Sequence, residues 1–186
     1  MMHLPPIPAW ESLHPLIIHF PIVLLLLSPL FLLIGAALSP AKGLPYRYAG
    51  LLILLLGTVS LFVAAATGEA AGELAERGGG VDAVLTAHEN LASQTRLLFV
   101  GLSVILLGMI ALPRILHRQE TRLSSTFMPL AYLVFYSVGI LYLVNTAHAG
   151  GRLVHEFGVH AEMPVSDGAT SATATEAQEP AESRTD

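Results

Sequence analysis

The sequence predicts an all-α fold, an integral membrane antiparallel four-helix bundle with a disordered C-terminal tail. Hydrophobic residues make up 53% of the 186 residues and charged residues 12%, and the mean hydropathy is +0.64. A water-soluble domain of this length carries more charge, so the composition indicates a membrane protein. We predict three parts: an N-terminal segment at 1–12, one helical transmembrane domain at 13–161 and an acidic tail at 162–186.

The first apolar segment, at 14–38, opens with the run His14-Pro-Leu-Ile-Ile-His19-Phe-Pro21. It is long enough to cross a bilayer. No lysine or arginine precedes it, so we expect a retained span rather than a cleaved secretory signal. Pro21 and Pro29 should kink this helix unless neighbouring helices supply hydrogen bonds to the carbonyls that the prolines leave free.

Three further apolar segments follow. Prolines 40 and 45 predict a turn at 39–48, and a second span covers 49–67, ending among small residues that permit close helix contact. Three glycines at 78–80 indicate a flexible connection to a third span, which begins near Ser93 and ends at Pro113. The fourth span covers 128–149. From Met163 onward the sequence has no apolar periodicity, which is typical of a disordered acidic tail.

The basic residues predict the orientation of the four spans. The turns between spans one and two and between spans three and four contain Lys42, Arg47, Arg114, Arg118 and Arg122. The opposite side has fewer basic residues near the spans, namely Arg77, Arg96 and Arg152. The positive-inside rule therefore places both turns in the cytoplasm and both termini on the outer side of the membrane.

Antiparallel packing then brings distant polar residues to one end of the bundle. Spans one and three start at the outer face, where spans two and four end. The residues expected at this face are His14, His19, Glu69, Glu73, His88, Arg96, His148 and His155. An ionisable side chain inside a span is costly, so it is a functional candidate by default. We predict that His19 lies in the inner layer of a site and His14 at its rim.

Such a cluster suits a b-type haem. A low-spin haem b needs two imidazoles from facing helices, small residues that admit the macrocycle and a cation near its propionates. The axial pair would be His14 or His19 with His88, His148 or His155, and the cation would be Arg96 or Arg152. The chain has no cysteine, which excludes covalent c-type haem, iron–sulfur clusters and thiolate zinc sites.

Two other chemistries use the same residues. A transition metal ion could be held by a set drawn from His14, His19, His88, His148 and Glu69. A proton path would need the same histidines and carboxylates without any cofactor. The structural alternatives are that His19 bonds a neighbouring backbone carbonyl, that His14 is an ordinary interfacial residue and that His88 belongs to a solvated helix end. The sequence has no His-Glu-x-x-His, Gly-x-Ser-x-Gly or phosphate loop, and without a basic patch we expect no nucleic-acid partner.

Three stretches resemble a known family. The opening Leu-His-Pro-Leu-Ile-Ile-His-Phe-Pro at 13–21, the Thr-Gly-x-x-Ala-Gly step at 67–72 and the closing Gly-Gly-Arg-Leu-Val-His-Glu-Phe-Gly-Val at 150–159 are similar to those of the bacterial four-helix membrane family called domain of unknown function 2231. Many members carry a histidine just before the closing Gly-Val. Here that position is Phe157, so the resemblance leaves the fourth-span ligand between His148 and His155.

The resemblance implies a bacterial membrane protein and a redox context, and together with the orientation above we expect an inner-membrane location with both termini in the periplasm. Similar domains occur beside c-type cytochrome or Rieske domains in other chains. We therefore expect a cytochrome b-like electron carrier in the lipid bilayer, acting between a periplasmic cytochrome or Rieske-type partner and a quinone or a larger membrane complex. The alternative is a non-haem metal-binding or transport-accessory membrane protein.

Overall fold

A computed structural model describes residues 8–75, 78–119 and 121–159. These ranges are helical and contain no strand. Four stretches are long and apolar enough to cross a membrane: Trp10–Ala37, Pro40–Leu74, Val81–Ile115 and Leu123–His155. The predicted all-α, four-helix membrane fold is confirmed. The predicted tail at 162–186 lies outside the described residues.

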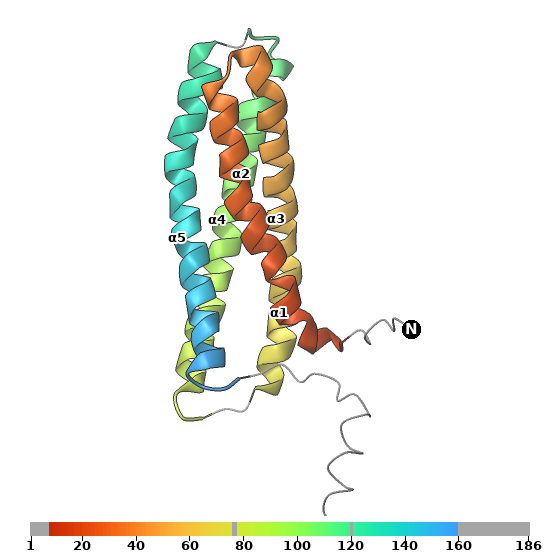
Figure 1. The fold of residues 1–186 in the computed structure, drawn as a ribbon, viewed down its shortest axis with the longest axis vertical. Helices are drawn as coiled ribbons and strands as arrows, with labels where there is room; N and C mark the ends of the chain where they lie inside the picture. The colour runs from red at the N-terminus through yellow and green to blue at the C-terminus, as the bar shows by residue number, and fades with distance from the viewer. Residues whose placement is uncertain (1–7, 76–77, 120, 160–186) are drawn as a thin grey trace, which may run out of the picture.

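The helices alternate in direction along the bundle (Figure 1). The elements are, in order, η1 (Trp10–Leu13), α1 (His14–Ile17), α2 (His19–Ala37), α3 (Pro40–Leu74), α4 (Val81–Ile115), η2 (Leu123–Phe127) and α5 (Met128–His155). The beginnings of α1 and α4 lie at the same end as the last turns of α3 and α5. We call this end, which carries His14 and His88, the histidine end.

The prolines of the first span shape it differently. Pro21 has no N–H to offer the carbonyl of Ile17, so one helical hydrogen bond is missing where α1 meets α2, but Ile18 between them keeps helical backbone angles and its N–H bonds the His14 carbonyl. Pro29 lies inside α2 and leaves the carbonyl of Leu25 without its usual donor. The hydroxyl of Tyr136 on α5 donates to that carbonyl at 2.7 Å. A neighbouring helix thus satisfies the carbonyl that Pro29 leaves free.

Two predicted boundaries were wrong. The turn expected at 39–48 is helical, because α3 begins at Pro40, a position in the first turn where a missing N–H costs nothing. Only Leu38 and Ser39 have extended backbones between α2 and α3. Likewise, α4 continues past Pro113 to Ile115.

The main core lies between the four helices and contains both aromatic and aliphatic side chains. Phe99 and Tyr136 are buried and meet edge to face, with ring centroids 5.5 Å apart. Glycines on α3 let α2 approach closely: a β-carbon at Gly57 would come within 2.8 Å of Leu25. Large apolar side chains cover the outside of all four spans, as expected for helices that contact lipid.

A smaller apolar cluster lies at the histidine end, between α4 and α5. Val81, Val84 and Leu85 on α4 pack with Leu153 on α5. The segment after α5 folds back against them, and its Val159 N–H donates to the Leu153 carbonyl at 3.0 Å. This cluster forms part of the wall of the candidate site.

Candidate functional site

The candidate site is a cavity of about 760 Å³ at the histidine end. It lies between two hairpins, the first formed by α1, α2 and α3 and the second by α4 and α5. Its volume is in the range of small-molecule and cofactor sites, about 300–1,000 Å³. Both His14 and His88 line it, together with Arg96 and several small residues, among them Gly68, Ala71, Gly72, Ala92 and Gly150.

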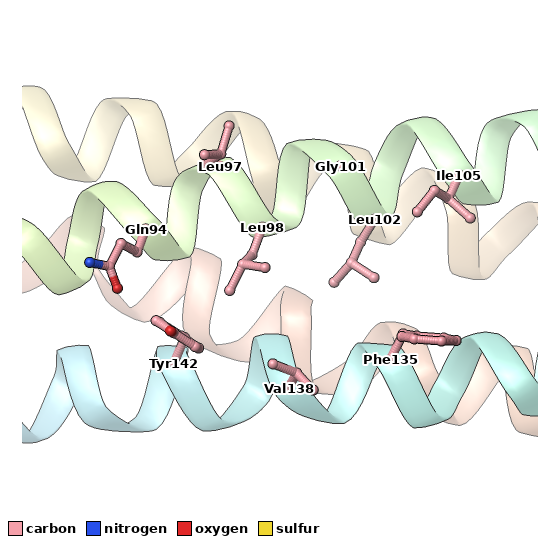
Figure 2. A pocket seen from close by; sticks show the side chains of 9 residues that line it. All are labelled: Gln94, Leu97, Leu98, Gly101, Leu102, Ile105, Phe135, Val138 and Tyr142. Atoms are coloured by element: carbon pink, nitrogen blue, oxygen red, sulfur yellow. The ribbon is translucent and has the colours of Figure 1, made fainter.

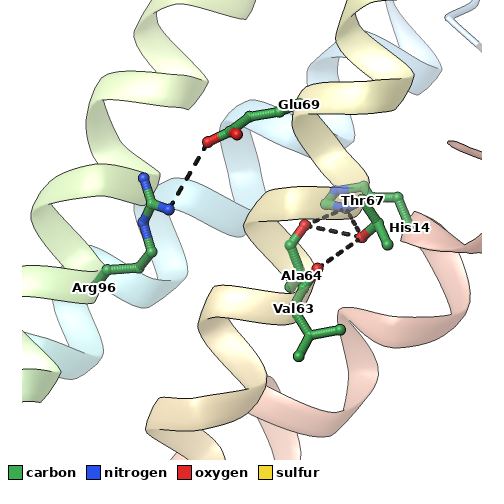
Figure 3. A network of polar contacts seen from close by, with 6 residues as sticks. All are labelled: His14, Val63, Ala64, Thr67, Glu69 and Arg96. Atoms are coloured by element: carbon green, nitrogen blue, oxygen red, sulfur yellow. Dashed lines mark hydrogen bonds and ion pairs between the residues drawn. The ribbon is translucent and has the colours of Figure 1, made fainter. Parts of the chain in front are cut away.

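The backbone of α3 holds the ring of His14. Its Nδ1 lies 2.8 Å from the carbonyl oxygen of Ala64 and 3.2 Å from the hydroxyl oxygen of Thr67 (Figure 3). Because a carbonyl only accepts, Nδ1 carries the proton and Nε2 keeps its lone pair. A β-carbon at Gly68 would come within 2.8 Å of the ring's Cε1, so glycine makes room for the imidazole.

The second hairpin holds His88 in the same way. Its Nδ1–H donates to the carbonyl of Thr146 on α5 at 3.0 Å, again leaving Nε2 with a lone pair. A β-carbon at Gly150 would lie 3.0 Å from the Cε1 of His88. The hydroxyl of Thr146 lies 2.8 Å from that of Thr95, which is buried on α4. This contact joins α4 and α5 directly beside the histidine.

The two hairpins therefore contain one repeated unit. In each, a histidine near the start of the first helix bonds a carbonyl on the last helix and rests on a glycine four residues after that carbonyl. Four residues is about one helical turn, so carbonyl and glycine share a face. The carbonyls are those of Ala64 and Thr146, and the glycines are Gly68 and Gly150.

An ion pair connects the hairpins across the cavity. The Nη1 atom of Arg96 on α4 lies 3.8 Å from Oε1 of Glu69 on α3 (Figure 3). The guanidinium also lies 6.0 Å from the ring centroid of Phe62. The Glu69 side chain is 67% exposed, and a pair in such surroundings contributes at most about 1 kcal/mol of stability. Its main effect is to hold a guanidinium on the cavity wall, where it can meet an anionic group.

Other predicted site residues lie outside the cavity, contrary to the prediction that they share one site. His19, His148 and His155 are exposed and do not line the cavity. The backbone stays helical through Ile18, so five residues rotate the side-chain direction by about 140° between His14 and His19. The prediction of His19 in the inner layer and His14 at the rim was therefore wrong.

His148 and Arg152 also face away from the cavity wall. His148 precedes Gly150 by two residues, which places it about 160° around α5. Arg152 bonds within its own segment: its Nε lies 2.9 and 3.0 Å from the two carboxylate oxygens of Glu156. These hydrogen bonds lower the pKa of the Glu156 carboxyl below its ordinary value. Any cofactor role for His19, His148, His155 or Arg152 stays a prediction.

The metal-ligand set is not assembled as the alternative requires. Within residues 8–75, 78–119 and 121–159, no three or more His, Asp or Glu side chains form a group that could hold a metal ion. His14 and His88 share the cavity with Glu69, whereas His19 and His148 lie outside it.

The sequence did not predict the role of Gly68 and Gly150, because a glycine in a span indicates close packing but not which side chain packs there.

Four lipid-length helices, with a cavity at one end that two backbone-anchored histidines line, define a polytopic membrane protein with a built site at that end. The family described as "Predicted membrane protein (DUF2231)" matches residues 11–163, which is most of the chain, so the protein belongs to this family. The family expected from the sequence motifs is thus confirmed. No curated protein and no solved structure matches the chain.

Proposed function

We propose that this protein is a membrane-embedded electron carrier that binds one haem b in the cavity at the histidine end, with His14 and His88 as axial ligands. One observation carries the proposal. The two imidazoles come from different hairpins, line one cavity, and each donates Nδ1–H to a backbone carbonyl. That second bond is typical of metal-binding histidines, because it fixes the ring and leaves Nε2 for the metal.

The other residues of the cavity fit a haem. The wall also contains Ala71, Gly72 and Ala92, whose small size leaves room for a flat macrocycle. Arg96 lines the cavity and provides a cation for a propionate. When bound, haem supplies reversible one-electron exchange, while the chain supplies ligands and burial.

The structure favours haem over the metal-ion alternative on ligand number. A protein site for zinc or copper takes three or four side chains, whereas a low-spin haem takes two. His14 and His88 are two, and the described residues offer no group of three. A non-haem metal-binding or transport-accessory role would need Glu69 or an outside molecule to complete the site.

We place the histidine end on the periplasmic side of a bacterial inner membrane. Support comes from the opposite end of the bundle, where Arg47, Arg114, Arg118 and Arg122 gather by the turns. Arg114 lies over the ring of Tyr48 at 5.0 Å, a contact suited to a membrane interface. In this orientation the haem would exchange electrons with a periplasmic cytochrome or Rieske-type protein and with a quinone or a larger membrane complex.

The visible spectrum of protein purified from haem-sufficient cells tests the proposal. We expect a Soret band, a reduced-minus-oxidised α band and one haem per chain by pyridine haemochrome assay. A colourless preparation would overturn the haem assignment. Stoichiometric zinc, copper, nickel or iron in that preparation would instead support the metal-ion alternative.

A further inference from the structure

A groove of about 500 Å³ lies between α4 and α5, on the surface of this helix pair that faces lipid. Its lining includes Leu98 and Gly101 on α4 and Phe135 and Val138 on α5 (Figure 2). Phe135 is 70% exposed, so this groove opens on the surface that contacts lipid. A molecule could therefore enter it sideways from the bilayer.

Two polar side chains lie at one end of the groove. Gln94 on α4 and Tyr142 on α5 both line that end, and the rest of the lining is apolar (Figure 2). Neither the Gln94 amide nor the Tyr142 hydroxyl makes a side-chain hydrogen bond to another described residue. Gln94 is exposed, and its amide and the Tyr142 hydroxyl are both available to an occupant that accepts hydrogen bonds.

The groove has no charged side chain in its lining, which restricts the kind of molecule that can bind there. Both Gln94 and Tyr142 can donate to a carbonyl oxygen. No charged side chain lines the groove, so a phosphate, a carboxylate or an ammonium would be buried without a counter-charge. The lining therefore suits a neutral molecule with a carbonyl-bearing head and a long apolar tail. It disfavours phospholipids and fatty acids.

The polar end of the groove is joined to the haem site through α5. The carbonyl of Tyr142 accepts a hydrogen bond from the Thr146 hydroxyl at 2.8 Å, and the carbonyl of Thr146 accepts one from His88 at 3.0 Å. On α4, Gln94 follows His88 by six residues, a rise of about 9 Å. That separation is short enough for both sites to serve one electron path.

We infer that the α4–α5 groove binds a membrane-soluble quinone, with a ring carbonyl at Gln94 and Tyr142 and the tail along Val138 and Phe135. The choice of a quinone among neutral lipids rests on the electron-transfer function proposed above. Binding itself needs no haem. The two proposals can therefore fail separately.

Photolabelling with azido-decylubiquinone in phosphatidylcholine nanodiscs tests the groove. Gly101→Leu would fill it, and Gly108→Leu is the matched control on the same helix. A β-carbon at either glycine meets nothing within 4 Å, but only Gly101 lines the groove. We expect labelling of α4 and α5 peptides to fall about tenfold in Gly101→Leu, equivalent to about 1.4 kcal/mol of binding, and to be unchanged in Gly108→Leu.

Competition identifies the occupant. Excess unlabelled decylubiquinone should abolish the labelling and equal oleate should not. Equal labelling of the two glycine variants, or displacement by oleate as effective as by quinone, would overturn the inference. If the protein contains haem but is not labelled, only the quinone-binding inference is overturned. If it is colourless but is labelled as expected, only the haem proposal is overturned.

Discussion

The imidazole of His88 rests on Gly150 so closely that a β-carbon there would lie 3.0 Å from its Cε1 atom. A ring fixed in this way has little room to move when the glycine is replaced. We predict that Gly150→Ala displaces the imidazole and lowers haem occupancy several-fold, or changes the ligand field of the iron. Haem per chain and the low-spin electron paramagnetic resonance spectrum of the oxidised protein measure the two effects.

Gly151→Ala is the control for this substitution. It lies one residue further along α5, and a β-carbon there meets nothing within 4 Å. It should bind haem like the unchanged protein. Equal haem loss in the two variants would show that replacing any glycine in this part of α5, rather than displacing the His88 ring, causes the effect. Gly68→Ala should repeat the Gly150→Ala result in the first hairpin, because its β-carbon would lie 2.8 Å from His14 Cε1.

The hydrogen bond between Tyr136 and the carbonyl of Leu25 should stabilise the bundle because of Pro29. Tyr136→Phe leaves a buried carbonyl without a partner, and we predict a loss of about 1–3 kcal/mol in the free energy of unfolding in mixed micelles. In a Pro29→Ala background, residue 29 regains an N–H for that carbonyl. The loss should then be smaller by about 1 kcal/mol. The same loss in both backgrounds would contradict this explanation.

Sequence reasoning predicted the spans and the end at which the polar residues gather, but not which histidines face inward. The length of each apolar segment decides the spans, and the alternating direction of successive spans decides which ends meet, so both follow from the order of residues along the chain. His14 and His19 lie on different faces of one continuous helical path, and a span that is apolar on nearly all sides does not reveal which face meets the neighbouring helices. The turn predicted at 39–48 was wrong because a proline signals a turn and a helix start equally well, and Pro40 starts a helix.

The orientation of the bundle can be tested with single cysteines, since the chain has none. Ala87 at the histidine end and Gln119 in the turn after α4 are both exposed. We predict that a membrane-impermeant maleimide labels Ala87→Cys on intact spheroplasts, and labels Gln119→Cys only after the membrane is permeabilised. The reverse pattern would place the histidine end in the cytoplasm.

The pairing of His14 with His88 is the central claim, and reduced-minus-oxidised spectra of four histidine variants test it most directly. His14→Ala and His88→Ala remove the two imidazoles that line the cavity, and each should lose the low-spin α band. His19→Ala and His148→Ala change exposed residues outside the cavity and should keep it. An intact α band in His14→Ala or His88→Ala, or its loss in His19→Ala or His148→Ala, would contradict the assignment.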